Sequence, residues 1–125
     1  MSSLNLKVAL IIYGAIHIAQ GIILLAVPDR VTEFSGFEVL ASSEYFLAIL
    51  GGTFIAAGVL FAITGFNPLQ NINGVRFAVL WAGLLLIIPL FALRLENVDF
   101  DHVMFIVIEN AIFTAAFLMF YPYRR

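Results

Sequence analysis

The chain has 125 residues and a formal net charge of −2, and 63% of its residues are hydrophobic while only 11% are charged. A soluble domain is about half apolar and about one quarter charged. The mean hydropathy of +1.08 therefore excludes an ordinary water-soluble domain and predicts an all-α integral membrane protein. No basic patch suggests a nucleic-acid partner, and the lack of cysteine excludes disulfides and thiolate metal sites.

Four apolar segments are long enough to cross a bilayer, which takes about 20 residues. We expect helices at about 6–27, 44–65, 75–93 and 102–121. Polar stretches such as "VPDR", "ASSE" and "GFNPLQNING" separate the first three segments. The whole chain, 1–125, is therefore predicted to be one four-helix transmembrane bundle, embedded in the lipid bilayer.

The basic residues predict how this bundle is oriented. One end carries most of the Lys and Arg residues: Lys7, Arg76, Arg124 and Arg125. The loops at the other end carry seven of the eight acidic residues. Because the basic side of a membrane protein is normally cytoplasmic, we expect both termini in the cytoplasm and the acidic loops outside, in a multi-pass protein of the cell membrane.

Two helices share a glycine pattern. "GAIHIAQG" in the first helix resembles "GGTFIAAG" in the second, and Gly14 and Gly21, like Gly51 and Gly58, are seven residues apart. This spacing places both glycines of a pair on one helix face. Small residues let helix backbones approach closely in lipid, so we expect these four glycines to pack against other helices.

These glycine faces, together with the turn and third helix "NPLQNINGVRFAVLWAGLL", resemble the small DoxX-like membrane proteins, in particular the BphX-like group. The resemblance covers most of the chain. It implies a four-helix bundle, and it implies no catalytic residues and no cofactor.

Polar residues interrupt the apolar helices at matching depths. Glu109 and Asn110 stand within "FIVIENAIFTAAF", and Gln20 lies about as far from the outer end of its helix as Glu109 does. Tyr13 and His17 share a helix face with Gln20. Ionisable side chains in membrane helices usually face the interior and have a partner. We therefore predict one cluster in the outer half of the bundle, made of these five residues and Thr53, with Glu109 bonded to Gln20 or His17.

Charged residues near the outer surface suggest a mouth above this cluster. Glu44 begins the second helix and Arg94 ends the third, and Arg94 has the reach to approach Glu44 or Glu109. His17 and Glu109 are too few to hold a metal ion, so no metal site is predicted. The sequence contains no nucleophile with its base, no phosphate loop and no catalytic carboxylate pair, so no enzymatic activity is indicated.

Several functions fit the polar cluster. Convergent polar groups in an apolar interior are typical of small-molecule sites, which suggests binding of a small apolar or amphipathic ligand or a lipid. An accessory subunit of a larger membrane complex is an alternative, in which the polar groups only fix the helix register. A third is a homo-oligomeric transporter or a proton or ion pathway, which would use Glu109 and His17.

Overall fold

A computed structural model describes residues 2–27, 41–95 and 98–123 of the chain. These residues form four α-helices: α1 (Ser2–Ala26), α3 (Ala41–Phe66), α4 (Ile72–Ala92) and α5 (Phe100–Met119). The prediction of an all-helical chain with four helices is confirmed. Each helix begins a few residues before its predicted start, because hydropathy detects the apolar part of a helix and polar residues are common in the first turn.

Three of the described helices are long and apolar enough to cross a membrane, over Ser3–Ala26, Tyr45–Phe66 and Ile72–Ala92. α5 has a shorter apolar stretch, Val103–Met119. Its 20 residues nevertheless extend about 30 Å at 1.5 Å per residue, which is about the thickness of the hydrocarbon core. Only 33%, 22% and 17% of the residues in the most apolar windows of α1, α3 and α4 are buried within the molecule, so most of the apolar surface faces outward.

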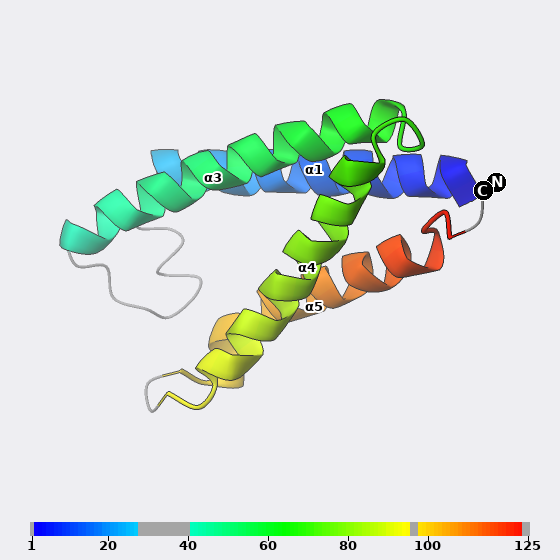
Figure 1. The fold of residues 1–125 in the computed structure, drawn as a ribbon. Coiled ribbons are helices and arrows are strands. Elements are labelled where there is room, and N and C mark those ends of the chain that lie inside the picture. Colours follow the sequence, from blue (N-terminus) through cyan, green and yellow to red (C-terminus); the bar gives the residue numbers. More distant parts are fainter. Residues whose placement is uncertain (1, 28–40, 96–97, 124–125) are drawn as a thin grey trace.

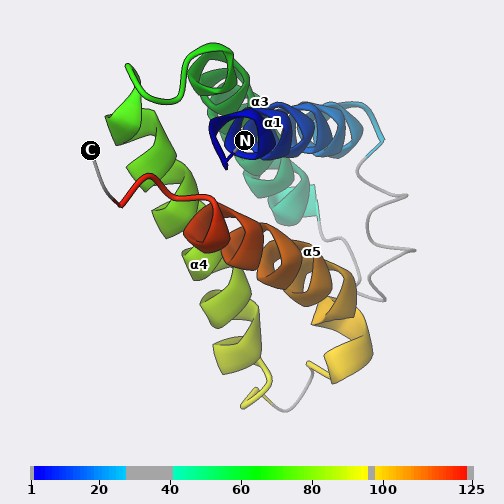
Figure 2. The same cartoon turned by 90° about the vertical axis from the view of Figure 1, so that its right-hand side faces the viewer.

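The helices are arranged as two pairs. α1 lies along α3, and α4 lies along α5, when the molecule is viewed from the end at which the termini lie (Figure 2). The turn between α3 and α4 is at this same end, and from there the two pairs diverge toward the other end (Figure 1). The molecule is thus closed at the end with the termini and spread at the end where α3 and α5 begin.

Glycines bring α1 and α3 into backbone contact. A Cβ atom on Gly14 would lie 2.6 Å from the carbonyl oxygen of Gly58, and one on Gly21 would lie 2.5 Å from that of Gly51. The predicted packing of these four glycines is therefore confirmed, and they pair with each other in antiparallel order. Gly65, seven residues beyond Gly58, also lies against α1: a Cβ atom there would lie 2.7 Å from the side chain of Ile11 and 3.2 Å from the carbonyl oxygen of Lys7. This extends the contact to the closed end.

The common core occupies the closed half of the bundle. All four helices contribute buried side chains to it, including Tyr13 from α1, Phe61 from α3, Val75 from α4 and Phe117 from α5. These side chains come from the first halves of α1 and α4 and the second halves of α3 and α5, which are the segments nearest the termini. Tyr13 belongs to both this core and the predicted polar cluster, whose other members in α1, His17 and Gln20, follow it along the helix.

Candidate functional site

Glu109 faces α1 from α5. The amide Nε2 of Gln20 donates a hydrogen bond of 2.8 Å to Glu109 Oε2, as the matching depth of the two residues predicts. The other carboxyl oxygen, Oε1, is buried and has no hydrogen-bond partner in the described part of the chain. Each unsatisfied polar atom in an apolar interior is costly, so Oε1 is an acceptor to which a further hydrogen-bond donor could bind.

Asn110, the neighbour of Glu109, forms a second link between α5 and α1. The hydroxyl of Tyr13 donates to Asn110 Oδ1, and Asn110 Nδ2 donates to the carbonyl oxygen of Ile106, one turn back on α5, at 2.9 Å. Tyr13 is fully buried and Asn110 almost so. Both polar side chains are thus satisfied by protein, which gives this link a structural role.

His17 connects α1 to α4. The indole Nε1 of Trp81 donates to His17 Nε2 at 2.8 Å, and His17 Nδ1 lies 3.0 Å from the carbonyl oxygen of Tyr13. Because an indole N–H only donates, Nε2 must be the acceptor, and the ring hydrogen must be on Nδ1, which donates to Tyr13. The two bonds together fix His17 as a neutral imidazole in one tautomer.

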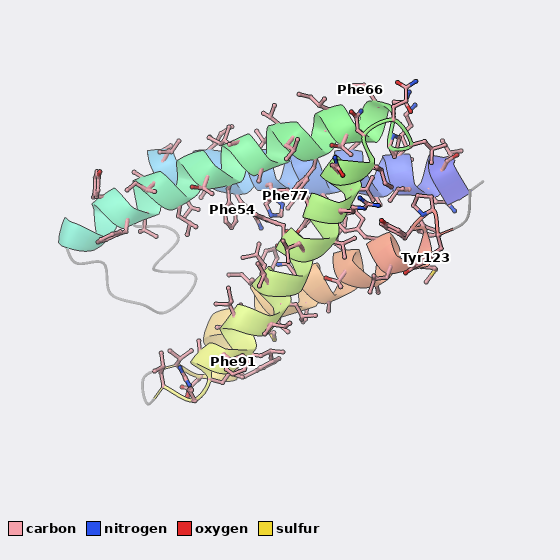
Figure 3. All side chains as sticks on the ribbon, in the orientation of Figure 1. Phe54, Phe66, Phe77, Phe91 and Tyr123 are labelled. Atoms are coloured by element: carbon pink, nitrogen blue, oxygen red, sulfur yellow. The ribbon has the colours of Figure 1, made fainter. Side chains whose placement is uncertain are left out.

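Aromatic rings enclose His17. Its ring centroid lies 4.1 Å from that of Tyr13, 5.0 Å from that of Phe54 and 5.6 Å from that of Phe61. Phe54 of α3 and Phe77 of α4 point into the angle between these two helices (Figure 3), and each packs on Trp81 with centroids 5.8 and 5.7 Å apart. With no exposed surface, His17 is part of the packed interior and is closed to a ligand.

The remaining predicted site residues lie elsewhere. Thr53 is exposed on α3 and its hydroxyl donates to the carbonyl oxygen of Ile49 in the same helix at 2.9 Å, so its predicted membership of the cluster is not what the structure shows. Arg94 is exposed just beyond α4 and forms no ion pair with Glu109. The side chain of Glu44, the other predicted member of the mouth, lies outside the described residues.

The cluster therefore divides into two parts with different chemistry. In the part made of Tyr13, His17, Asn110 and the partly buried Trp81, the side-chain hydrogen bonds are made within the protein. The pair of Gln20 and Glu109 is partly buried and keeps one acceptor, Glu109 Oε1, without a partner among the described residues. Within the described residues, no three His, Asp or Glu side chains converge in a way that could hold a metal ion. Trp81 is the member that sequence reasoning did not assign to the cluster. The N–H of an indole in the middle of an apolar helix needs a hydrogen-bond acceptor. This was the one feature of the sequence that could have assigned Trp81 to the cluster.

Comparisons with protein-family models, with curated proteins and with solved structures give no significant match. The similarity to DoxX-like proteins therefore stays a prediction from the residues quoted above. The functional argument rests on the geometry of the site.

Proposed function

We propose that the protein is a multi-pass protein of the cell membrane, with all four helices in the bilayer. Large apolar side chains are exposed along every helix, for example Ile22, Ile63, Ile88 and Ile112. A surface of this kind in water far exceeds the apolar patches of soluble monomers. In lipid it is the expected exterior, and helices satisfy their own backbone hydrogen bonds there.

The proposed orientation places both termini in the cytoplasm. The closed end of the bundle carries Lys7 and Arg76, and no acidic residue occurs in the described segments that form it. In the sequence, two further arginines follow the last described residue at this end. The cytoplasmic side of membrane proteins is enriched in such residues. The spread end of the bundle then faces outward, and the pair of Gln20 and Glu109 lies in the outer half.

Cysteine labelling tests this orientation without background, because the chain has no native cysteine. In intact cells, Ser3→Cys and Asn71→Cys should be protected from a membrane-impermeant thiol reagent and should react after the cells are opened. Ser35→Cys, in the first acidic loop, should react in intact cells. Protection of Ser35→Cys together with reaction of Ser3→Cys would reverse the proposed topology.

The proposed activity is binding of a small amphipathic molecule whose head group carries a hydrogen-bond donor, such as a hydroxyl or an ammonium group. The observation that carries this proposal is Glu109 Oε1, which is buried beside Gln20 without a donor. A donor on a ligand would satisfy this oxygen, and the ligand's apolar part would contact the apolar helix surfaces nearby. Sites for small molecules commonly combine an apolar lining with a few convergent polar groups.

An accessory subunit is the second candidate. In that case a helix of a partner protein would bring the donor to Glu109, and the apolar exterior would contact that helix in place of lipid. The side chains packed around His17, whose hydrogen bonds are made within the protein, are compatible with an accessory subunit. A proton pathway through His17 receives less support, because both ring nitrogens already have protein partners and no hydrogen bond among the described residues joins His17 to Glu109.

Trp81 offers a direct test of ligand binding, because it is the single tryptophan of the chain and is bonded to His17, one turn from Gln20. Brominated long-chain amine and alcohol should quench its fluorescence saturably when added to the protein in phosphatidylcholine nanodiscs. The matched brominated methyl ether, which has no donor, should quench only weakly and without saturation. Identical quenching by all three compounds would contradict the proposed donor-dependent site, and co-purification of a stoichiometric partner with no quenching would favour the accessory subunit.

A further inference from the structure

A cavity opens at the closed end of the bundle, far from the polar cluster. It has a volume of about 320 Å³ and lies between the start of α4 and the segment that follows α5. The residues that line it are Ile72, Arg76, Tyr121, Pro122 and Tyr123. It therefore combines one cation with two phenol rings at the predicted cytoplasmic surface.

The cation in this cavity has no acidic partner among the described residues. Arg76 Nε donates to the hydroxyl oxygen of Tyr121 at 3.2 Å, and Arg76 Nη1 donates to Asn73 Oδ1 at 3.4 Å. Both acceptors are neutral, and the guanidinium remains exposed. The sequence has no Asp or Glu between residues 45 and 95 or after residue 109. The positive charge is thus oriented by neutral partners and left free for an anion.

The two tyrosines are held in place by a tight turn. The backbone N–H of Tyr123 donates to the carbonyl oxygen of Tyr121 at 2.9 Å, which makes a three-residue turn around Pro122, whose ring restricts the backbone. The two phenol rings lie 4.9 Å apart, and Tyr123 lies beside the end of α5 (Figure 3). Because the Tyr121 oxygen accepts from Arg76, its own hydrogen remains available for donation to a ligand.

An apolar stripe leads from the cavity along α4. Leu80, Leu84 and Ile87 follow Arg76 at intervals of four, four and three residues, so they share its helix face. All three are exposed, Leu80 to 58%. A molecule with an anionic head in the cavity could therefore extend its apolar chains along this face.

We propose that the cavity binds the phosphate of an anionic phospholipid from the cytoplasmic leaflet. The guanidinium and the Tyr121 hydroxyl donate to the phosphate oxygens, a chemistry for which arginine is well suited. Tyrosines are enriched at this depth of the membrane, and cytoplasmic basic residues attract anionic lipids. The acyl chains lie on the stripe of Leu80, Leu84 and Ile87, which distinguishes a lipid from free phosphate.

Native mass spectrometry of the purified protein, with equal amounts of phosphatidylglycerol and phosphatidylcholine, tests this site. The wild type should retain phosphatidylglycerol preferentially. Arg76→Gln should lower that preference about fivefold, since one basic residue near the surface contributes on the order of 1 kcal/mol. Arg94→Gln, at the opposite end, should leave it unchanged. An equal preference in wild type and Arg76→Gln, or an equal loss in both variants, would overturn the proposal.

Two further measurements exclude misfolding as the cause and distinguish a lipid phosphate from a free phosphate ester. Tyr121→Phe keeps the ring and removes the hydroxyl, so it should lower the preference by a smaller factor while the thermal unfolding curve is unchanged. Glycerol phosphate, added at the concentration of the lipid, should fail to displace phosphatidylglycerol. Full displacement by glycerol phosphate would show a site for free phosphate esters and would contradict a lipid site.

Discussion

Leucine in place of Gly21 or Gly58 should separate α1 from α3 and prevent stable folding. A single Cβ atom at Gly21 would lie 2.5 Å from the carbonyl oxygen of Gly51, and one at Gly58 would lie 2.6 Å from that of Gly14. The obstructing atoms belong to the backbone, so they cannot turn aside as a flexible side chain can. Overpacking of this kind costs about 1–3 kcal/mol for small additions, and leucine adds three further carbon atoms.

Gly52 provides the matched control, because it neighbours Gly51 in the same helix and nothing lies within 4 Å of a Cβ atom there. Gly52→Leu should unfold at the temperature of the wild type in detergent, whereas Gly21→Leu and Gly58→Leu should unfold far lower or fail to accumulate. Gly21→Ala should give an intermediate loss. Equal stability of the leucine variants at positions 21 and 52 would contradict the backbone contact of α1 with α3.

Glu109→Leu should abolish saturable quenching of Trp81 by the brominated amine and alcohol while the bundle stays folded. The substitution removes the acceptor proposed to meet the ligand. It also removes one hydrogen bond to Gln20, but interhelical hydrogen bonds in membranes contribute only about 0.6 kcal/mol on average. We therefore expect no saturable quenching over the concentration range that saturates the wild type, with only a small change in unfolding temperature.

Glu109→Gln separates hydrogen bonding from charge. The amide oxygen of this variant can accept from Gln20 Nε2 as the carboxyl oxygen does, so the fold should be retained. If the carboxylate acts through its charge, this variant should lose the amine and keep the alcohol. Asp101→Asn neutralises an exposed acid at the start of α5 and should leave the binding of both the amine and the alcohol unchanged. Unaltered quenching in Glu109→Leu would remove Glu109 from the binding site.

The sequence predicts some parts of this structure because they follow from spacing along one helix. Glycines seven residues apart necessarily share a face, and the equal depth of Gln20 and Glu109 follows from counting residues. The pairing of Gly14 with Gly58 and of Gly21 with Gly51 depends on the relative shift of two helices. No sequence pattern within either helix determines this shift.

Trp81 and Thr53 show why the rest of the cluster was not predictable. Trp81 meets His17 only if α4 is rotated so that the indole faces α1. The sequence of α4 is almost uniformly apolar around Trp81 and has no polar face that would indicate this rotation. A threonine hydroxyl in a helix has two ways to be satisfied: a bond to another helix or a bond to the carbonyl four residues earlier. Thr53 makes the second, with Ile49, and spacing alone does not distinguish these outcomes.

The divergence of the two helix pairs also could not be predicted. Hydropathy gives the number and length of the helices but not the angles between them. These angles follow from side chains that meet only in three dimensions, such as the buried set of Tyr13, Phe61, Val75 and Phe117. Because that set lies in the closed half, the polar pair of Gln20 and Glu109 is left in the half where α3 and α4 separate (Figure 1).

The central claim, that Glu109 faces Gln20 inside a membrane-embedded bundle, can be measured by cross-linking in native membranes. The variant with Gln20→Cys and Glu109→Cys should react in high yield with a short, membrane-permeant, thiol-specific cross-linker, because the native side chains are in hydrogen-bond contact at 2.8 Å. The variant with Gln20→Cys and Ile108→Cys should react poorly, since Ile108 is 50% exposed on the outward face of α5. Equal yields, or a higher yield for position 108, would place Glu109 toward lipid and contradict the account.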